Sequence, residues 1–285
     1  GFLSNNFAII GVARRLKDDQ EFRNWVRDSV MTFGNPVGDL DSFVSHFYYQ
    51  SHDVTDPQSY LELKQLADRL DSDYSLEGNR IFYLAMSPEY FGTVTSHLKN
   101  SGLTNTSGYK RLVIEKPFGH DLASAIELNN EIRTTFDESE IYRIDHYLGK
   151  EMVQNIEVIR FANAIFEPLW NNRYISNIQV TSSEMLGVEE RARYYDKSGA
   201  LRDMVQNHMI QIVSLLAMEP PIKLTTDEIR SEKVKVLRAL RPIKPSEVDD
   251  FFVRGQYGPG QIQGKPVPGY REEPNVNPDS NTETF

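Results

Sequence analysis

A run of nine residues, 143–151, brings a carboxylate, an imidazole, a phenol and an ammonium together around one glycine. Residues 141–144 predict a short strand and residues 151–161 predict a helix, so the run lies at a strand-to-helix junction. The first amides of a helix lack intrahelical partners and lie at the positive end of its dipole, so they attract anions. Because Lys150 and His146 add donors and positive charge, the junction is suited to a phosphate dianion. A solvated loop before an ordinary helix start is the alternative interpretation.

A histidine on an apolar helix face is the second candidate for chemistry. Residues 200–218 have helical periodicity, and His208 lies within the apolar stripe. The stripe consists of Leu201, Met204, Val205, Ile212 and Leu215. Most histidines in such a position are hydrogen-bonded core residues. An enzyme that oxidises an alcohol, however, needs a base for the hydroxyl proton, and a partly buried imidazole with an orienting carboxylate can be that base.

The composition narrows the class of protein. A chain of 285 residues with 39% hydrophobic and 25% charged residues predicts a soluble globular protein of one large or two moderate domains. No apolar run approaches the length of a membrane span, and we expect no secretory leader. The absence of cysteine excludes disulfides and thiolate catalysis and favours a cytoplasmic location. A net charge of −10 argues against nucleic acid as a partner, and the six histidines lack metal-binding spacing, so we expect no metal.

Alternating strand and helix patterns in the first half predict a Rossmann-like, doubly wound α/β domain with a mostly parallel sheet. The predicted strands are 7–13, 47–54, 81–86 and 112–114, and the predicted helices are 19–33, those that start at Asp56-Pro57 and Ser87-Pro88, and 121–136. The Gly-rich turn that normally opens a nucleotide-binding sheet is absent. We therefore expect residues 1–145 to form an incomplete domain that lacks its first βα unit, of about 30 residues.

The second half, residues 146–285, predicts an α+β domain with an antiparallel sheet. Residues 175–185 alternate enough to indicate an antiparallel strand, whose end supplies Glu184. From Gly255 onward the chain is rich in Gly, Pro and Asn, which taken alone is typical of a flexible terminus.

Cofactor signals lie where predicted strands end, the edge at which open α/β sheets bind ligands. Arg14 follows the strand 7–13, at the place where NAD-specific folds tend to have an acidic residue that binds the ribose 2′-hydroxyl. A planar, permanently charged guanidinium suits a 2′-phosphate instead, which favours NADP over a solvated turn. The ends of the next two strands are expected to border the adenine and the nicotinamide half, at Asp53, Val54, Ala85 and Met86.

Three segments identify a family. Residues 143–151 read RIDHYLGKE, which resembles the signature of glucose-6-phosphate dehydrogenases. Residues 115–119, EKPFG, match the EKPxG string of the same family. The segment Met-Val-Gln-Asn-His-Met, which contains His208, matches a third sequence string of that family. A shorter EKP string occurs in other sugar and imine oxidoreductases, so Lys116 alone does not select the substrate. The resemblance covers nearly all of the chain.

The resemblance implies oxidation of glucose 6-phosphate at C1 to 6-phosphoglucono-δ-lactone, with hydride transfer to NADP, as the first step of the pentose phosphate pathway. It implies that His208 is the base and that Asp145 orients it. The implied substrate-binding residues are His146, Tyr147 and Lys150 for the phosphate and Glu184, Asp203 and Lys116 for the sugar. Lys116 also reaches the coenzyme, and Arg14 binds its 2′-phosphate.

The two ends differ from the family pattern. In the family, the N-terminal unit carries a Gly-Asp-Leu-Ala type turn. The family sequence that matches the tail continues into a large antiparallel sheet with a further substrate lysine and the subunit interface, so we expect the second domain to be incomplete and to lack most of this sheet. The intact enzyme is therefore expected to be a homodimer or a higher homo-oligomer. Two alternatives stay open: a non-catalytic sugar-phosphate-binding fragment, and another NADP-dependent sugar oxidoreductase that shares the EKP string. Strict NADP use and dual NAD and NADP use are both compatible with the sequence.

Overall fold

The structure is a computed structural model that describes residues 6–34 and 38–285. The chain divides into two compact units, Gly1–Ile144 and Asp145–Phe285. In the described residues, none of the helices is long and apolar enough to span a bilayer.

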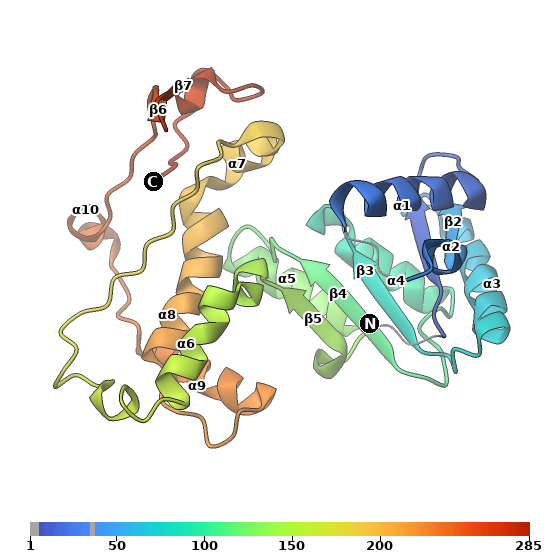
Figure 1. Cartoon of the computed structure of the whole chain (residues 1–285), viewed down its shortest axis with the longest axis horizontal. Helices are drawn as coiled ribbons and strands as arrows, with labels where there is room; N and C mark the ends of the chain where they lie inside the picture. The colour runs from blue at the N-terminus through green and yellow to red at the C-terminus, as the bar shows by residue number, and fades with distance from the viewer. Residues whose placement is uncertain (1–5, 35–37) are drawn as a thin grey trace. The chain divides into compact units, whose positions relative to one another are not determined.

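Parallel strands in the first unit form two sheets (Figure 1). One pairs β1 (Ile9–Ala13) with β2 (Phe47–Ser51), and the other has the order β3 (Arg80–Leu84), β4 (Lys110–Glu115) and β5 (Ile141–Ile144). The parallel pairing predicted from the alternation of strands and helices is confirmed. The single sheet that we expected is instead split, because β1 and β3 do not pair with each other.

Local capping explains where the helices of the first unit begin. The helices are α1 (Asp19–Phe33), α2 (Leu40–Ser45), α3 (Pro57–Tyr74), α4 (Phe91–Asn100) and α5 (Leu122–Arg133), with 3₁₀ turns η1 (Pro88–Tyr90) and η2 (Glu138–Glu140). Asp56 accepts hydrogen bonds from the amides at the start of α3, and Pro57 occupies the first helical position, as predicted. Ser87 and Pro88 begin a helical segment as predicted, but this segment is the 3₁₀ turn η1, which precedes α4, and the Ser87 side chain makes no capping bond.

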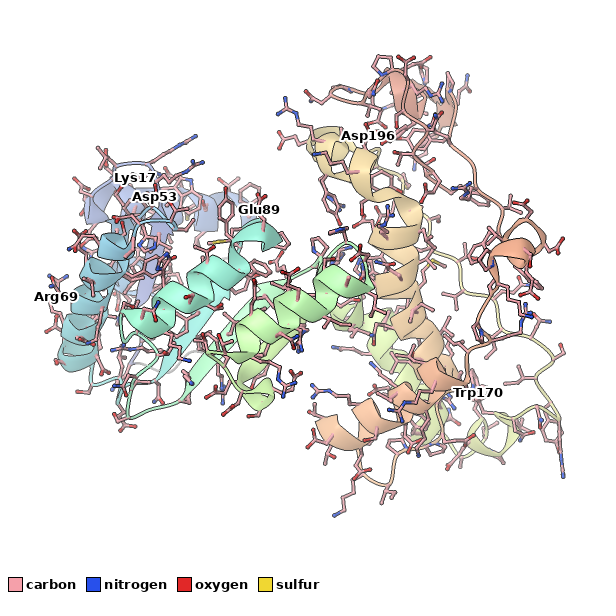
Figure 2. The ribbon with its side chains drawn as sticks, turned by 180° about the vertical axis from the view of Figure 1, so that it is seen from behind. Lys17, Asp53, Arg69, Glu89, Trp170 and Asp196 are labelled. Atoms are coloured by element: carbon pink, nitrogen blue, oxygen red, sulfur yellow. The ribbon has the colours of Figure 1, made fainter. Side chains whose placement is uncertain are left out.

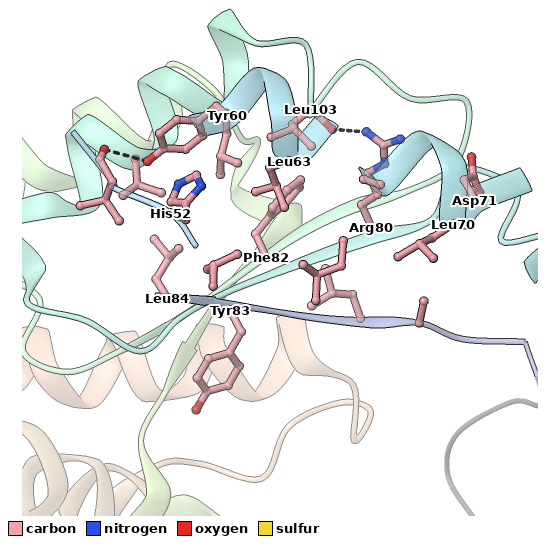
Figure 3. A pocket seen from close by; sticks show the side chains of 18 of the residues that line it. His52, Tyr60, Leu63, Leu70, Asp71, Arg80, Phe82, Tyr83, Leu84 and Leu103 are labelled. Carbon is pink, nitrogen blue, oxygen red and sulfur yellow. Dashed lines mark hydrogen bonds between the residues drawn. The ribbon is translucent and has the colours of Figure 1, made fainter. Parts of the chain in front are cut away.

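A cavity of about 220 Å³ lies beside the split in the sheet. Ile10 and Val12 of β1, Phe82 and Leu84 of β3, and Tyr60 of α3 are among the residues that line it (Figure 3). The main core of the unit lies between β3–β5 and the helices α3–α5. Its fully or almost fully buried members are Tyr60, Phe91, Leu103, Leu112, Ile114, Ile132 and Phe136.

The second unit is mainly helical. Its helices are α6 (Glu151–Phe161), α7 (Ala192–Ala200), the π-helix η6 (Leu201–Met209), α8 (Ile210–Ala217), α9 (Thr226–Ala239) and α10 (Val248–Phe251). Its 3₁₀ turns are η3 (His146–Gly149), η4 (Glu167–Leu169), η5 (Glu189–Arg191), η7 (Pro245–Glu247) and η8 (Tyr270–Glu272). An antiparallel hairpin joins β6 (Gly260–Ile262) to β7 (Lys265–Val267).

Two predictions for the second unit are wrong. Residues 175–185 contain no strand, because no described segment pairs with them and a strand needs a neighbour for its backbone groups. The tail is folded against the unit rather than flexible. Tyr270 is fully buried and packs with Ala192 and Val276, and its hydroxyl donates to Asp196 at 3.0 Å. Asp196 lies in α7 and is labelled in Figure 2.

The segment 200–218 is helical as predicted, but its first half is a π-helix. The i→i+5 hydrogen bonding of a π-helix places residues five apart on adjacent turns, and such segments often occur at functional sites. Asp203 and His208 are five apart and are both buried, whereas Leu201 is 42% exposed. The predicted apolar stripe is therefore wrong at Leu201, because the wider turn shifts the buried face.

Candidate active site

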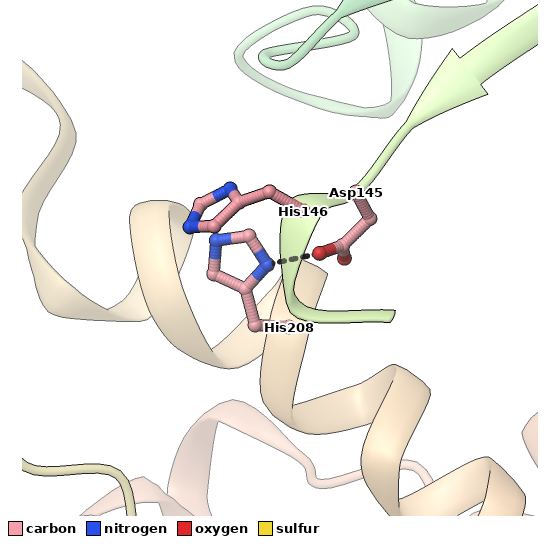
Figure 4. A group of neighbouring side chains, drawn as sticks. All are labelled: Asp145, His146 and His208. Carbon is pink, nitrogen blue, oxygen red and sulfur yellow. Dashed lines mark hydrogen bonds and ion pairs between the residues drawn. The ribbon is translucent and has the colours of Figure 1, made fainter. Parts of the chain in front are cut away.

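Asp145 and His208 form a hydrogen-bonded pair, although they lie 63 positions apart (Figure 4). Asp145 follows β5 directly, and one of its oxygens, Oδ1, caps η3 by accepting the amide of Tyr147 at 3.0 Å. The same Oδ1 lies 2.5 Å from Nδ1 of His208. An ionised carboxylate can only accept, so Nδ1 is the nitrogen that carries the proton. Nε2 is then left with the lone pair that a general base needs.

Two rings enclose the imidazole of His208, which has no exposed surface. The Tyr147 ring is stacked on it, with the centroids 4.1 Å apart and the planes 16° apart. The His146 ring contacts it edge-to-face at 4.7 Å, and Figure 4 shows His146 beside the ring nitrogen that Asp145 does not contact. His146 is itself exposed. His146 is therefore the exposed neighbour of Nε2.

The cationic end of the site lies at the start of α6. Lys150 immediately precedes that helix, and no side chain caps its first turn. Lys150 and His146 are both exposed, and the Lys150 ammonium lies 3.6 Å from the centroid of the Tyr147 ring. An exposed ammonium and an exposed imidazole beside an uncapped helix start are an arrangement that suits phosphate.

The hydroxyl of Tyr147 points to a carboxylate. It donates to Oε1 of Glu184 at 2.8 Å and lies 3.1 Å from Oγ of Ser182. Burial raises the pKa of Tyr147 above its ordinary value, and the hydrogen bond to Glu184 raises it further. Ser182 was not predicted from the sequence, because only the fold brings it to Tyr147.

Asp203 is fixed by two residues that the sequence analysis missed. Nη2 of Arg191 lies 3.1 Å from its carboxylate, and the hydroxyl of Tyr194 donates to it at 3.1 Å. Arg191 ends η5 and Tyr194 lies in α7, and their spacing from Asp203 follows no periodicity that a sequence search uses. Because Asp203 is only 1% exposed, these donors satisfy a carboxylate that would otherwise be costly to bury.

The predicted cofactor residues of the first unit lie at the carboxyl ends of its strands. Arg14 follows β1 and is exposed. The pKa of the Asp53 carboxyl is lowered mainly by Thr55, whose amide and hydroxyl donate to it at 2.9 and 2.8 Å, and to a smaller extent by the nearby Arg14. The exposed Ala85 follows β3, and the half-buried Lys116 follows β4.

The cavity beside β1 and β3 also has a polar member that the sequence analysis missed. The cavity is lined by Val54 and Met86, which the sequence analysis expected to border the cofactor. His52 lines it as well (Figure 3). His52 is 3% exposed, and no described group makes a hydrogen bond with its Nδ1. Burial lowers the pKa of His52, against a smaller opposing effect of the Ser59 backbone. His52 lies near the end of the predicted strand 47–54 and directly after the observed strand β2, and this position was the available signal.

Among the described residues, Asp145, His146 and His208 form a group with ligand atoms close enough to hold a metal ion, all within 4.8 Å of one another. Nδ1 of His208 is already bonded to Asp145. We therefore interpret the group as an acid–base pair with an adjacent histidine.

Comparisons with known proteins cover the whole chain. Residues 1–155 match the family model described as "Glucose-6-phosphate dehydrogenase, NAD binding domain", and residues 157–285 match its "C-terminal domain". The chain is 65% identical over 285 residues to glucose-6-phosphate 1-dehydrogenase of Bacillus subtilis (strain 168) and 52% identical to that of Streptococcus pneumoniae. Both alignments cover 100% of this chain and 58% of the relative, so the chain spans little more than half their length.

A solved structure gives the same result. It is described as "Glucose-6-phosphate dehydrogenase in complex with its substrate glucose-6-phosphate", with a TM-score of 0.87 and 37% sequence identity. The match covers 99% of this chain and 58% of the solved chain.

Proposed function

We propose that this chain, which belongs to the glucose-6-phosphate dehydrogenase family, carries the base, the phosphate site and part of the NADP site of that enzyme. The family resemblance of RIDHYLGKE is confirmed by the matches over the whole chain. The proposed reaction converts glucose 6-phosphate to 6-phosphoglucono-δ-lactone. The observation that carries the proposal is the bond between Asp145 and His208, because it joins a base to the loop that holds the candidate phosphate residues.

His208 is proposed to take the proton of the C1 hydroxyl through Nε2 as C1 loses a hydride. Bound NADP supplies the hydride acceptor. Asp145 keeps the proton on Nδ1 and stabilises the imidazolium once Nε2 is protonated. The oxidation is then balanced, since one hydride and one proton leave the alcohol and a C1 carbonyl forms.

The substrate is proposed to be held at both ends. Lys150 and His146 bind the phosphate, which is supported by their exposure and by the uncapped start of α6. Asp203 and Glu184 accept hydrogen bonds from the sugar hydroxyls. Lys116 is proposed to reach both sugar and coenzyme, a role that rests on the EKPFG string.

The NADP site is proposed at the carboxyl edge of the strands in the first unit. Arg14 binds the 2′-phosphate, which is supported by its exposure at the end of β1. Asp53 and Val54 border the adenine, and Ala85 and Met86 border the nicotinamide half. Residues 1–145 are thus the nucleotide-binding domain and residues 146–285 the substrate domain.

We also propose that the two sheets of the first unit are parts of one doubly wound sheet. In the described residues, β1 pairs only with β2 and β3 only with β4, so each has an unpaired edge, and both strands line the same cavity. A parallel strand between them would pair both edges. Adding a peptide that corresponds to the first strand of a full-length relative should protect the β1 and β3 amides from hydrogen exchange, and unchanged exchange would contradict this arrangement.

The experiment that tests the function measures binding and turnover together. Calorimetry on the 285-residue chain should detect glucose 6-phosphate, show competition by inorganic phosphate, and give much weaker binding of glucose. An active form of the protein should then produce NADPH from glucose 6-phosphate. Binding without turnover in any form would favour the sugar-phosphate-binding fragment. Equal use of glucose and glucose 6-phosphate would favour a different NADP-dependent sugar oxidoreductase.

Self-association into a homodimer or larger homo-oligomer and a cytoplasmic location are proposals that rest on the family and on the absence of cysteine. Sedimentation velocity tests the first, and fractionation of cells that express the protein tests the second.

A further inference from the structure

The ring of Tyr147 lies between two functional side chains. The Lys150 ammonium is 3.6 Å from its centroid, and the His208 imidazole is stacked on it at 4.1 Å. Groups that approach one centroid this closely cannot share a face, because non-bonded heavy atoms keep about 3.5–4.0 Å between them. Lys150 and His208 therefore occupy opposite faces of the ring.

The Tyr147 ring is itself held in place at several points. It is 6% exposed and packs in a cluster with Ile212 and Leu215. Its hydroxyl donates to Glu184, and its amide donates to the same carboxylate oxygen of Asp145 that contacts Nδ1 of His208. The orientation of the ring is thus fixed from both of its ends.

A single hydrogen bond leaves the plane of an imidazole unspecified. The bond between Asp145 and Nδ1 fixes one atom of His208, whereas rotation about the last side-chain torsion of a histidine is broad. A flat ring stacked at 16° restricts that rotation. Nε2 is then directed along one line, which matters because a misplacement of about 1 Å can cost about 10²-fold in rate.

We propose that Tyr147 is a positioning residue that acts through its ring: it sets the plane of the His208 imidazole and fixes the spacing between the base and Lys150. The family resemblance assigned Tyr147 to the phosphate, whereas its hydroxyl is here bonded to Glu184. The inference rests on the proposed role of His208 as base. It assigns to the ring a function separate from that of the hydroxyl.

Two substitutions separate the ring from the hydroxyl. Tyr147→Leu removes the flat face, and we expect kcat to fall by about 10²-fold with a smaller change in KM. Tyr147→Phe keeps the face and removes the donor to Glu184, so kcat should be restored to within about 10-fold of the parent while KM for glucose 6-phosphate rises. Tyr174→Leu is the matched control, since Tyr174 is 66% exposed and should change neither constant.

A spectroscopic readout tests the stack without turnover. In the 285-residue chain with isotope-labelled histidine, the ring-proton resonances of His208 should be shifted upfield by the stacked Tyr147. The shift should persist in Tyr147→Phe and disappear in Tyr147→Leu, with His208→Gln identifying the signals. Shielding that survives in Tyr147→Leu would overturn the stack.

The kinetic and spectroscopic results have distinct meanings. If shielding is lost in Tyr147→Leu but kcat is unchanged, the positioning role is wrong and the proposed base can stand. If kcat falls equally in the Leu and Phe variants, the hydroxyl and not the ring is responsible, which also overturns the inference. If His208→Asn retains full activity, the proposed function itself fails and the positioning role fails with it.

Discussion

The two candidate sites of this chain differ in how completely their polar groups are partnered. In the second unit, the proposed base His208, Asp145, Tyr147 and Asp203 are buried or half-buried and are held by hydrogen bonds and ring contacts. In the first unit, Arg14 is exposed, and His52 faces a cavity with its Nδ1 unpartnered. The candidate substrate site is therefore held in place by the described residues, whereas the candidate cofactor edge has polar and backbone groups that can accept additional partners.

The largest effect is expected from the pair of Asp145 and His208. His208→Asn should leave binding of glucose 6-phosphate near normal, because the base acts on the reacting hydroxyl. Turnover should fall by at least about 10²-fold, since proton transfer in the transition state is lost. Steady-state kinetics together with calorimetry would check this. Full activity in the variant would end the role of His208 as base and that of Asp145 as its orienting partner.

The next effect concerns the cationic end of the same site. Lys150→Ala should raise KM for glucose 6-phosphate by roughly 10- to 150-fold, the loss expected for a charged hydrogen bond of about 1.5–3 kcal/mol. A smaller fall in kcat is expected, because remote binding energy also positions the reacting carbon. Glucose has no phosphate for Lys150 to bind, so its kinetics are the control. If both substrates suffer equally, the phosphate assignment is wrong.

A smaller and more selective effect is expected at the cofactor edge. Arg14→Ala should weaken NADP by roughly 1–3 kcal/mol while NAD changes little, because only NADP carries the 2′-phosphate. Fluorescence titration with each cofactor measures both affinities. Arg15→Ala is a matched control, since Arg15 is also exposed and is the next residue in the chain. Equal losses for NAD and NADP in Arg14→Ala would reject the assignment.

Features that depend on local chemistry could be predicted from the sequence. Asp56 and Pro57 begin α3, and α6 spans the predicted residues 151–161, because capping and periodicity act within a few residues. The pairing of Asp145 with His208 was implied by the family resemblance, and the structure brings the two residues together.

Features that depend on distant neighbours could not be predicted in this way. Residues 175–185 have a strand-like pattern, but a strand requires a partner that periodicity does not reveal. The π-helix η6 is equally hidden, because the apolar pattern of residues 200–218 does not distinguish i→i+5 from i→i+4 hydrogen bonding. The ring contacts of Tyr147 and the bonds of Arg191 and Tyr194 to Asp203 also arise only on folding.

The smallest effect is expected at His52 in the first unit, where it concerns how stability depends on pH. Burial lowers the pKa of His52 below its ordinary 6.5, so the folded protein keeps this imidazole neutral at pH values where the unfolded chain protonates it. Between the folded pKa and 6.5 the unfolded state binds more protons, and stability therefore rises with pH. The contribution is complete above pH 6.5 and is lost as the pH falls towards the folded pKa, with a slope of at most about 1.4 kcal/mol per pH unit.

His52→Gln should reduce the pH dependence of the free energy of unfolding of the first unit. This free energy is measured at pH 5–7 from the hydrogen exchange of the β3 and β4 amides at increasing urea concentrations. His120→Gln is the control, because the side chain of His120 is 81% exposed and should leave the slope unchanged. The first-strand peptide described above can be added to both proteins. If it occupies the space between β1 and β3 and gives Nδ1 of His52 a partner, the pH dependence of stability should change in the parent and stay the same in His52→Gln. An identical pH dependence in the parent and in His52→Gln would show that His52 is not held neutral by burial, and the contrast between the two sites would then rest on Arg14 and the sheet edges alone.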